Sequence, residues 1–207
     1  NFSDTSVMEG GETAVRTALE YFGRLDIIIN NMVYDKPASS RREISNMEPQ
    51  DFDRAILKVV KSTFTATRHA AQHFRQQRSG RIVNVVKEII STQLGRSEEA
   101  ASSEAVVGFS RTVARDLGKY GVTCNGITSS GKESDITRIN TQHHIPTPSF
   151  FSAEAVLAVY LCTASAADIN GNIFGVSEGD IYVHSNPNVV RSVYKSSPLT
   201  MDDMDEI

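Results

Sequence analysis

Apolar residues recur along this chain at two spacings, one typical of helices and the other of buried strands. Spacings of three and four residues predict a helix that Asp4 or Ser6 caps and Gly23 ends, long helices over 50–77 and 98–119, and a shorter one over 153–164. The expected inward stripes of the first three helices are Val7, Val15, Ala18, Leu19 and Phe22; Phe52, Ile56, Val59, Val60, Phe64, Thr67, Ala71 and Phe74; and Ala101, Ala105, Val106, Phe109, Val113 and Leu117.

Short apolar runs between these helices predict strands that are covered on both faces. They lie at 25–29, 81–86, 121–127 and 173–176. Because helices separate the strands, we expect an α/β fold in which a parallel sheet carries helices on both faces. No internal repeat or linker is visible. We therefore expect one domain over residues 1–207, with a polar tail that starts at about residue 185 and ends acidic.

The composition narrows the classes of partner. A net charge of −4 and a pI of about 5.7 disfavour nucleic acid and anionic membranes, since both require a basic face. No apolar run approaches the roughly 20 residues that span a bilayer, and no signal peptide is visible at Asn1, so we expect a cytoplasmic protein. Cys124 and Cys162 lie in apolar segments without metal-ligand spacing and are expected to be reduced thiols.

Four segments resemble the short-chain dehydrogenase/reductase family in order and spacing. They are 22–31 (FGRLDIIINN), 81–85 (RIVNV), 107–117 (VGFSRTVARDL) and 120–125 (YGVTCN), which correspond to the fourth strand, the fifth strand, the active-site helix and the sixth strand of that family. The resemblance implies a Rossmann-like, doubly wound parallel sheet. It also implies that the first three strands and the Gly-rich turn of the family are absent from this chain, because residues 1–4 correspond to the end of the third strand.

The resemblance also locates the positions of the catalytic groups, and the expected residue types are missing there. The family uses a tyrosine as acid/base, a lysine one helical turn later, a serine and a helix asparagine. The serine position is Lys87 and the asparagine position is Val59. Counting back from Gly108 places Glu99 at the tyrosine and Ser103 at the lysine; counting forward from the fifth strand places Ala100 and Glu104 there instead. No tyrosine occurs between Tyr34 and Tyr120, and no lysine between Lys87 and Lys119.

The cofactor positions that the resemblance implies have changed as well. The family's Asn-Asn-Ala-Gly turn reads Asn30, Asn31, Met32 and Val33, and the two larger side chains would crowd the ribose. The Pro-Gly pair that lines the nicotinamide pocket is replaced by Ser129 and Ser130. We therefore expect no cofactor in this chain. A nicotinamide cofactor (NAD) would belong to an active partner.

The tail supplies a hypothesis for that partner. Residues 187–194 (PNVVRSVY) and 199–204 (LTMDDM) are similar to the C-terminal extension of hydroxyacyl-CoA dehydrogenases in the family. The chain thus resembles the inactive subunit of a heteromeric hydroxyacyl-CoA dehydrogenase of the benzylsuccinate-pathway type. In the family, helices 50–77 and 98–119 pair with those of a neighbouring subunit. Here the outward face of the second helix is expected to carry Val107, Ser110 and Ala114.

An alternative hypothesis is an enzyme with different, non-redox chemistry in the same pocket. Lys87 and Glu99 are expected to lie within salt-bridge reach and could form an acid/base pair, and His143 and His144 could reach the cleft. A third possibility is a binding module for a nucleotide or acyl-CoA. The altered turns argue against the nucleotide.

Overall fold

The structure is a computed structural model that describes most of the chain and leaves gaps between the described segments. The described residues are 3–32, 34, 42–87, 94–129, 153–177, 180–192, 194–201 and 203–204. The side chains of Lys87 and Ser177 lie outside this description.

A five-stranded sheet organises the fold, in the order β1-β2-β3-β4-β5. The first four strands are parallel: β1 (Ile27–Asn31), β2 (Gly80–Lys87), β3 (Val122–Ser129) and β4 (Ile173–Ser177). The expected α/β fold with its parallel sheet is therefore confirmed. The fifth strand, β5 (Asp180–Val183), was not predicted from the sequence. It pairs antiparallel with β4.

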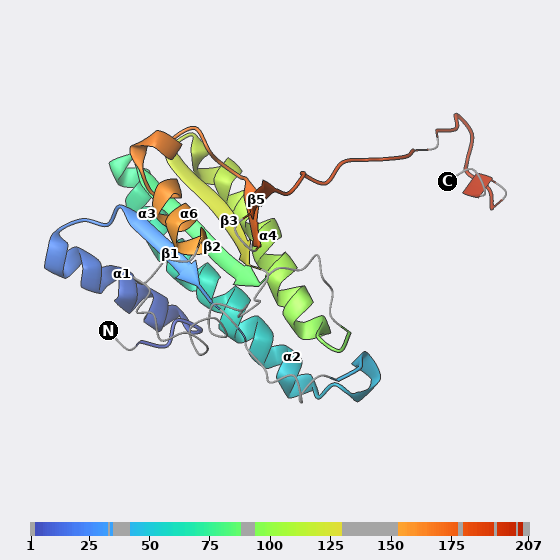
Figure 1. Ribbon diagram of the computed structural model, residues 1–207, viewed down its shortest axis with the longest axis horizontal. Coiled ribbons are helices and arrows are strands. Elements are labelled where there is room, and N and C mark those ends of the chain that lie inside the picture. Colours follow the sequence, from blue (N-terminus) through green and yellow to red (C-terminus); the bar gives the residue numbers. More distant parts are fainter. Residues whose placement is uncertain are drawn as a thin grey trace, which may run out of the picture.

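Helices cover both faces of the sheet (Figure 1). On one face, α1 (Met8–Phe22), α3 (Ser62–Gln77) and α4 (Ser97–Gly118) enclose a core around the fully buried Phe74 and Ile82. On the other face, α6 (Ala153–Leu161) packs Leu157 and Leu161 against Ile127. Alternate residues of β2 and β3 enter the two cores, as the pleat of a doubly wound sheet requires.

The first helix differs from the expected one at its start and in the exposure of its last residue. Neither Asp4 nor Ser6 caps it: the helix begins after Val7 without a side-chain cap, and Asp4 instead accepts a hydrogen bond from the backbone N–H of Ser6 at 2.9 Å. Gly23 ends it in the left-handed conformation at φ 73°, as expected. The ring of Phe22, expected inward, is 80% exposed, because it falls outside the face that meets α3.

The predicted helix 50–77 is a continuous helical stretch with a distorted centre. It consists of α2 (Pro49–Ala55), a π-helical turn η3 (Ile56–Lys61) and α3. The extra residue of the π turn rotates the helical phase, so the expected stripe does not stay inward. Val59 and Phe74 are buried, but Phe52 and Phe64 are 39% and 37% exposed. Threonine and alanine side chains fill much of the buried face: Thr63, Thr65, Ala66, Thr67 and Ala70.

The inward face of α4 agrees only partly with the expected one. Val106, Val113 and Leu117 are buried as expected, at 1%, 9% and 6% exposure, but the residues expected to face outward are buried as well. Val107, Ser110 and Ala114 are buried inside the subunit, at 6%, 0% and 2% exposure. Ala101 and Ala105, expected inward, are exposed. Small side chains occur on both sides of this helix, so the sequence pattern could not separate the face that meets the sheet from the face that meets solvent.

A chain of buried polar side chains crosses the centre of the fold. Asn30 donates to Thr67 Oγ1 and to Asn84 Oδ1, and Asn84 donates to Ser110 Oγ, at 3.0, 2.8 and 2.8 Å. Ser110 in turn donates to the carbonyl of Val106. These bonds join β1, β2, α3 and α4, and they satisfy amide groups that would otherwise be buried at a cost of about 1–3 kcal/mol each.

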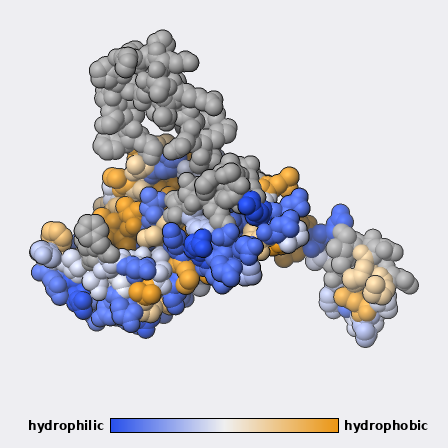
Figure 2. Space-filling model, turned by 90° about the horizontal axis from the view of Figure 1, so that it is seen from below, coloured by the Kyte–Doolittle hydropathy of each residue, from blue (hydrophilic) through white to orange (hydrophobic). Residues whose placement is uncertain are grey.

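The C-terminal segment after β5 leaves the body and stands apart from it (Figure 1 and Figure 2). Contacts with the body occur at its beginning, where the backbone N–H of His184 donates to the carbonyl of Ile173. Further along, Val189, Val190 and Tyr194 are 84%, 98% and 91% exposed. The segment ends in a local turn in which Asp203 accepts from Thr200 and from Lys195.

Two helical glycines give a matched test of this packing. A Cβ on Gly11 would stand 2.8 Å from atoms of Thr65, whereas a Cβ on Gly108 would meet nothing within 4 Å. We expect Gly11→Ala to lower the free energy of unfolding by about 1–3 kcal/mol, because α1 must move away from α3. Gly108→Ala should raise it by up to about 1 kcal/mol through helix propensity. Urea unfolding of both variants measures these changes, and equal midpoints would contradict the close approach.

Candidate functional site

The candidate site lies where the parallel strands end. The carboxyl ends of β1, β2 and β3 meet at one edge of the sheet, which places Asn31, Lys87 and Ser129 on neighbouring strands. Open α/β sheets bind ligands at this edge. The backbone register pairs Asn31 with Val85, and Lys87 with Ser129. Three of the positions singled out by sequence are therefore brought to one edge by strand pairing alone.

Two further positions lie on the first turns of α4, and their side chains are enclosed by the protein. Glu99 is 7% exposed and Ser103, one turn later, is 5% exposed. The residues of the alternative count lie elsewhere on the helix, with Ala100 half-buried and Glu104 exposed. The helix therefore turns Glu99 and Ser103 inward together, as the family resemblance requires of its tyrosine and lysine.

An ion pair holds the carboxylate of Glu99. Arg96 Nη1 lies 2.8 and 2.7 Å from the two carboxylate oxygens, and the side chains of Arg96 and Glu99 are 16% and 9% exposed. Removing Arg96 would leave a nearly buried carboxylate without this counter-charge, which is a strongly disfavoured state. Arg96 is a site residue that the sequence analysis missed. The three-residue spacing of opposite charges at a helix start was the available signal.

The expected pair between Lys87 and Glu99 falls partly outside the described residues, since the side chain of Lys87 is not described. Val33, Ser130, His143 and His144 lie wholly outside them. These expectations remain predictions.

The asparagine position of the family is occupied by an apolar side chain. Val59 is 3% exposed, lies in the π-helical turn and packs in a cluster with Val86, Val106 and Val107. A valine offers neither a donor nor an acceptor. π-Helical turns are frequent at functional sites, but Val59 in this one contributes a hydrophobic contact.

At the positions where the family binds its cofactor, the side chains of Asn30 and Ser129 form hydrogen bonds with other residues of this chain. Asn30 is 2% exposed and its amide donates within the central polar chain. Met32 is half-buried. Ser129 donates to Glu154 Oε1 at 2.8 Å, so a carboxylate from the start of α6 stands beside the position that lines the nicotinamide pocket in the family. Glu154 is a second residue that the sequence analysis missed.

Other kinds of site find no support in the part of the chain that the structure describes. No cluster of three or more His, Cys, Asp or Glu residues that could hold a metal ion occurs there. No helix in that part is long and apolar enough to cross a membrane. Both cysteines are free thiols, and burial raises the pKa of Cys124 to about 12, which suppresses its reactive thiolate form.

Comparisons with known proteins agree with this geometry. Residues 3–144 match the short chain dehydrogenase family. A peroxisomal hydratase-dehydrogenase-epimerase of Neurospora crassa is 33% identical over 123 residues, 58% of this chain and 13% of the relative. The (2S)-[(R)-hydroxy(phenyl)methyl]succinyl-CoA dehydrogenase subunit BbsD of Thauera aromatica is 30% identical over 111 residues, 54% of this chain and 43% of the relative. The chain thus spans less than half the length of either protein.

The fold also matches a solved structure. A crystal structure of a short chain dehydrogenase from Mycobacterium avium superposes with a TM-score of 0.84 at 24% identity, and the match covers 100% of this chain and 70% of that chain. At this identity, the likeness concerns the fold alone.

Proposed function

The chain belongs to the short-chain dehydrogenase family, and we propose that within the family it is a non-catalytic subunit that scaffolds or stabilises an active paralogue. The paralogue would act on a hydroxyacyl-CoA with NAD. The name of one relative, a (2S)-[(R)-hydroxy(phenyl)methyl]succinyl-CoA dehydrogenase subunit, supports this substrate class, as does the resemblance of the C-terminal segment.

One observation carries the proposal: the tyrosine and lysine positions hold an ion-paired carboxylate and a hydroxyl. The family's reaction needs a phenol whose pKa is lowered by a neighbouring ammonium group. Ser103 carries no charge, and Glu99 is engaged by Arg96. Arg96 also occupies both carboxylate oxygens of Glu99, which argues against Glu99 as the base of a different reaction.

The residues present do not fit a bound nicotinamide dinucleotide. Met32 occupies a position where the family has a small side chain, and the Glu154 carboxylate stands beside Ser129. We therefore derive no hydride-transfer step for this chain.

The surface of α3 and α4 supports the scaffolding role. Phe64 and Phe109 meet edge to face with ring centroids 6.4 Å apart, and Phe64 remains 37% exposed. Beside them, the exposed face of α4 carries a row of small residues spaced by three and four: Ala101, Ala105, Gly108 and Thr112. Small residues next to exposed aromatic rings allow another helix to approach closely and to bury apolar surface. We propose helices 50–77 and 98–119 as the contact with the paralogue, through this outward face.

Titration with NAD or NADP tests the cofactor part of the proposal. We expect no heat of binding from the chain at up to about 1 mM nucleotide, because Met32 crowds the ribose position and the Glu154 carboxylate stands beside Ser129. A catalytically active member of the family serves as the positive control in the same calorimeter. A dissociation constant at or below tens of micromolar would contradict the proposal.

Restoring the catalytic residues tests the loss of chemistry directly. The double variant Glu99→Tyr with Ser103→Lys should show no dehydrogenase activity towards hydroxyacyl-CoA substrates, since the cofactor contacts are still missing. Absorbance of the reduced nicotinamide at 340 nm follows the reaction. The variant should be compared with Glu99→Phe and Ser103→Met, which have similar sizes and no acid/base function. Activity that appears only in the Tyr/Lys variant would show that the chain binds cofactor after all.

A further inference from the structure

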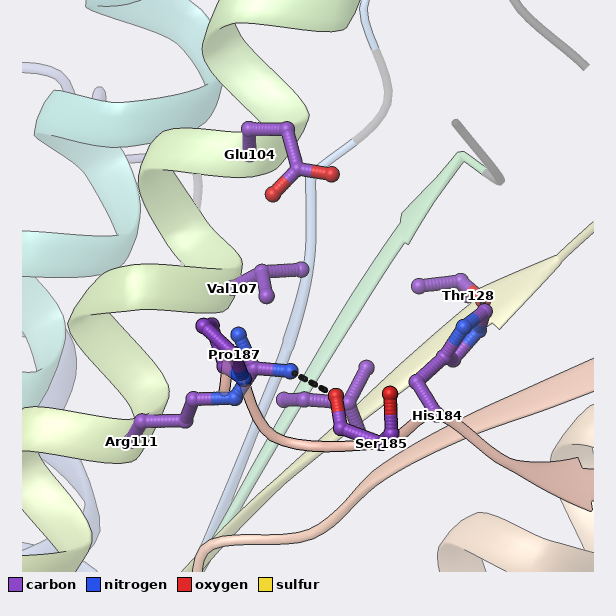
Figure 3. A pocket seen from close by; sticks show the side chains of 8 residues that line it. Glu104, Val107, Arg111, Thr128, His184, Ser185 and Pro187 are labelled. Atoms are coloured by element: carbon purple, nitrogen blue, oxygen red, sulfur yellow. Dashed lines mark hydrogen bonds between the residues drawn. The ribbon is translucent and has the colours of Figure 1, made fainter. Parts of the chain in front are cut away.

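A pocket between α4 and the start of the C-terminal segment lies apart from the degenerate catalytic positions. Its volume is about 270 Å³. One wall comes from one face of α4 and the other from the segment after β5, over a floor made by β3 and β4 (Figure 3). The described lining residues are Glu104, Val107, Arg111, Thr128, Ile173, His184, Ser185 and Pro187. Glu104 is the lysine position of the alternative count, but its side chain is exposed and points away from the buried Glu99 and Ser103.

Among the described residues that line this pocket, Arg111 has a buried side-chain nitrogen without a hydrogen-bond partner. Its Nη2 donates to the carbonyl of Ser185 at 3.3 Å, a long hydrogen bond, and its Nε is buried without a hydrogen-bond partner among the described residues. No described carboxylate lies within ion-pair distance of it. A guanidinium presents five donors in a rigid fork that matches a carboxylate or phosphate. The half-buried guanidinium of Arg111 has one acceptor among the described residues, so its remaining N–H groups are available to bind an anion.

The surroundings favour one class of anion. Val107, Ile173 and Pro187 give the pocket an apolar side, which suits a ligand with a short hydrocarbon body. Glu104 stands at the other end of the wall, seven residues from Arg111 and so about 10 Å along the helix (Figure 3). Its negative charge and the net charge of −4 disfavour a dianion more than a monoanion.

His184 is held at the side of the site, because its Nε2 lies 3.0 Å from Thr128 Oγ1. Its ring also packs edge to face on Tyr182 at a centroid distance of 5.3 Å. These two contacts hold the ring near Thr128, on the side of the pocket opposite to Arg111 (Figure 3). From these contacts we infer that the pocket binds a small carboxylate with an apolar body, held by the Arg111 guanidinium. This inference does not depend on whether the chain is catalytic.

Butyrate and acetate are the probes for this site. Butyrate should bind with a dissociation constant of about 1–10 mM, the range open to so small a ligand. Acetate should bind roughly tenfold more weakly, because two fewer methylene groups are buried. NMR titration of the full chain, followed at the His184 ring and the Val107 methyl groups, measures both constants and locates the site.

Matched variants make the test specific. Arg111→Met, which keeps the aliphatic stem, should weaken butyrate binding at least tenfold. Arg115→Met, on the exposed side of the same helix, should leave it unchanged. Glu104→Gln should strengthen it about two- to threefold by removing repulsion. Should Arg111→Met fail to fold, Arg111→Lys keeps the charge and loses the fork, and a several-fold loss is expected. Absence of saturable binding up to about 50 mM butyrate, or equal binding by the Arg111 and Arg115 variants, would overturn the inference.

Discussion

An aspartate in place of Ala105 is expected to separate this chain from its partner subunit while leaving its fold intact. Ala105 lies on the exposed face of α4, so the new carboxylate is solvated in the isolated chain. In the proposed complex it would be buried without a counter-charge, at a cost of several kcal/mol. A cost of about 4 kcal/mol weakens association roughly a thousandfold. Sedimentation of the co-expressed subunits should then show free chains, and the activity of the paralogue should fall with the complex.

The control variants separate loss of contact from loss of fold. Ala105→Ser should preserve the complex, because it changes size and polarity little. Ala114→Asp should unfold the chain instead, since Ala114 is 2% exposed in the subunit core and faces Gly171. Circular dichroism distinguishes these results. A complex that survives Ala105→Asp would place the interface elsewhere and would contradict the scaffold surface proposed for α3 and α4.

Asn84→Asp is expected to produce the largest loss of stability among the conservative substitutions in this chain, about 3–5 kcal/mol at pH 7. Asn84 is 1% exposed and stands at the centre of the polar chain, where its amide nitrogen donates to Ser110 and its oxygen accepts from Asn30. A carboxylate of the same shape keeps the acceptor, loses the donor and buries a charge. Asn188→Asp, in the exposed C-terminal segment, makes the same chemical change at the surface and should stay within about 0.5 kcal/mol of wild type.

The effect of Asn84→Asp should also depend on pH with a known sign. Burial raises the pKa of the new carboxyl in the folded state above its unfolded value of about 3.9. Between these two pKa values the folded state binds more protons, so the free energy of unfolding falls as pH rises, by up to about 1.4 kcal/mol per pH unit. Below pH 4 the variant should approach a neutral substitution. Urea unfolding at pH 4, 5.5 and 7 measures this slope, and a pH-independent loss would contradict burial of the group.

The helices and parallel strands could be predicted from the sequence, although their ends could not. The strands predicted at 25–29 and 121–127 are Ile27–Asn31 and Val122–Ser129 in the structure. Each continues into polar residues, because these residues still pair with the neighbouring strand β2. Asn30 is an example: its side chain is polar, yet its partners on β2 and α3 make it a strand residue of the core. The strand Asp180–Val183 was missed, because four residues carry too little alternation and depend on pairing with β4.

The candidate site divides in a similar way. The prediction that the catalytic tyrosine and lysine are replaced rests on the absence of tyrosine between Tyr34 and Tyr120 and of lysine between Lys87 and Lys119, in either count. The partners of Glu99 and Ser129 could not be predicted from the sequence. Arg96 reaches Glu99 because the start of α4 presents both side chains to the same space, and Glu154 reaches Ser129 from 25 residues away. Such contacts depend on how the loops and helices are placed after folding.

The sequence by itself determined the order of the main helices and of the four parallel strands, and with it the fold class, because these depend on local periodicity. The predicted loss of the family's catalytic groups also comes from the sequence, because it depends on residue identity. Only the tertiary structure decided which face of α4 is inward. Val107 and Ala114 are as apolar as Ala101 and Ala105, so the hydrophobic pattern alone permits either face. The sheet and the π turn select the face that carries Val107 and Ala114. Ala114 packs in a cluster with residues of β2 and β3, and Val107 packs in a cluster with Val59.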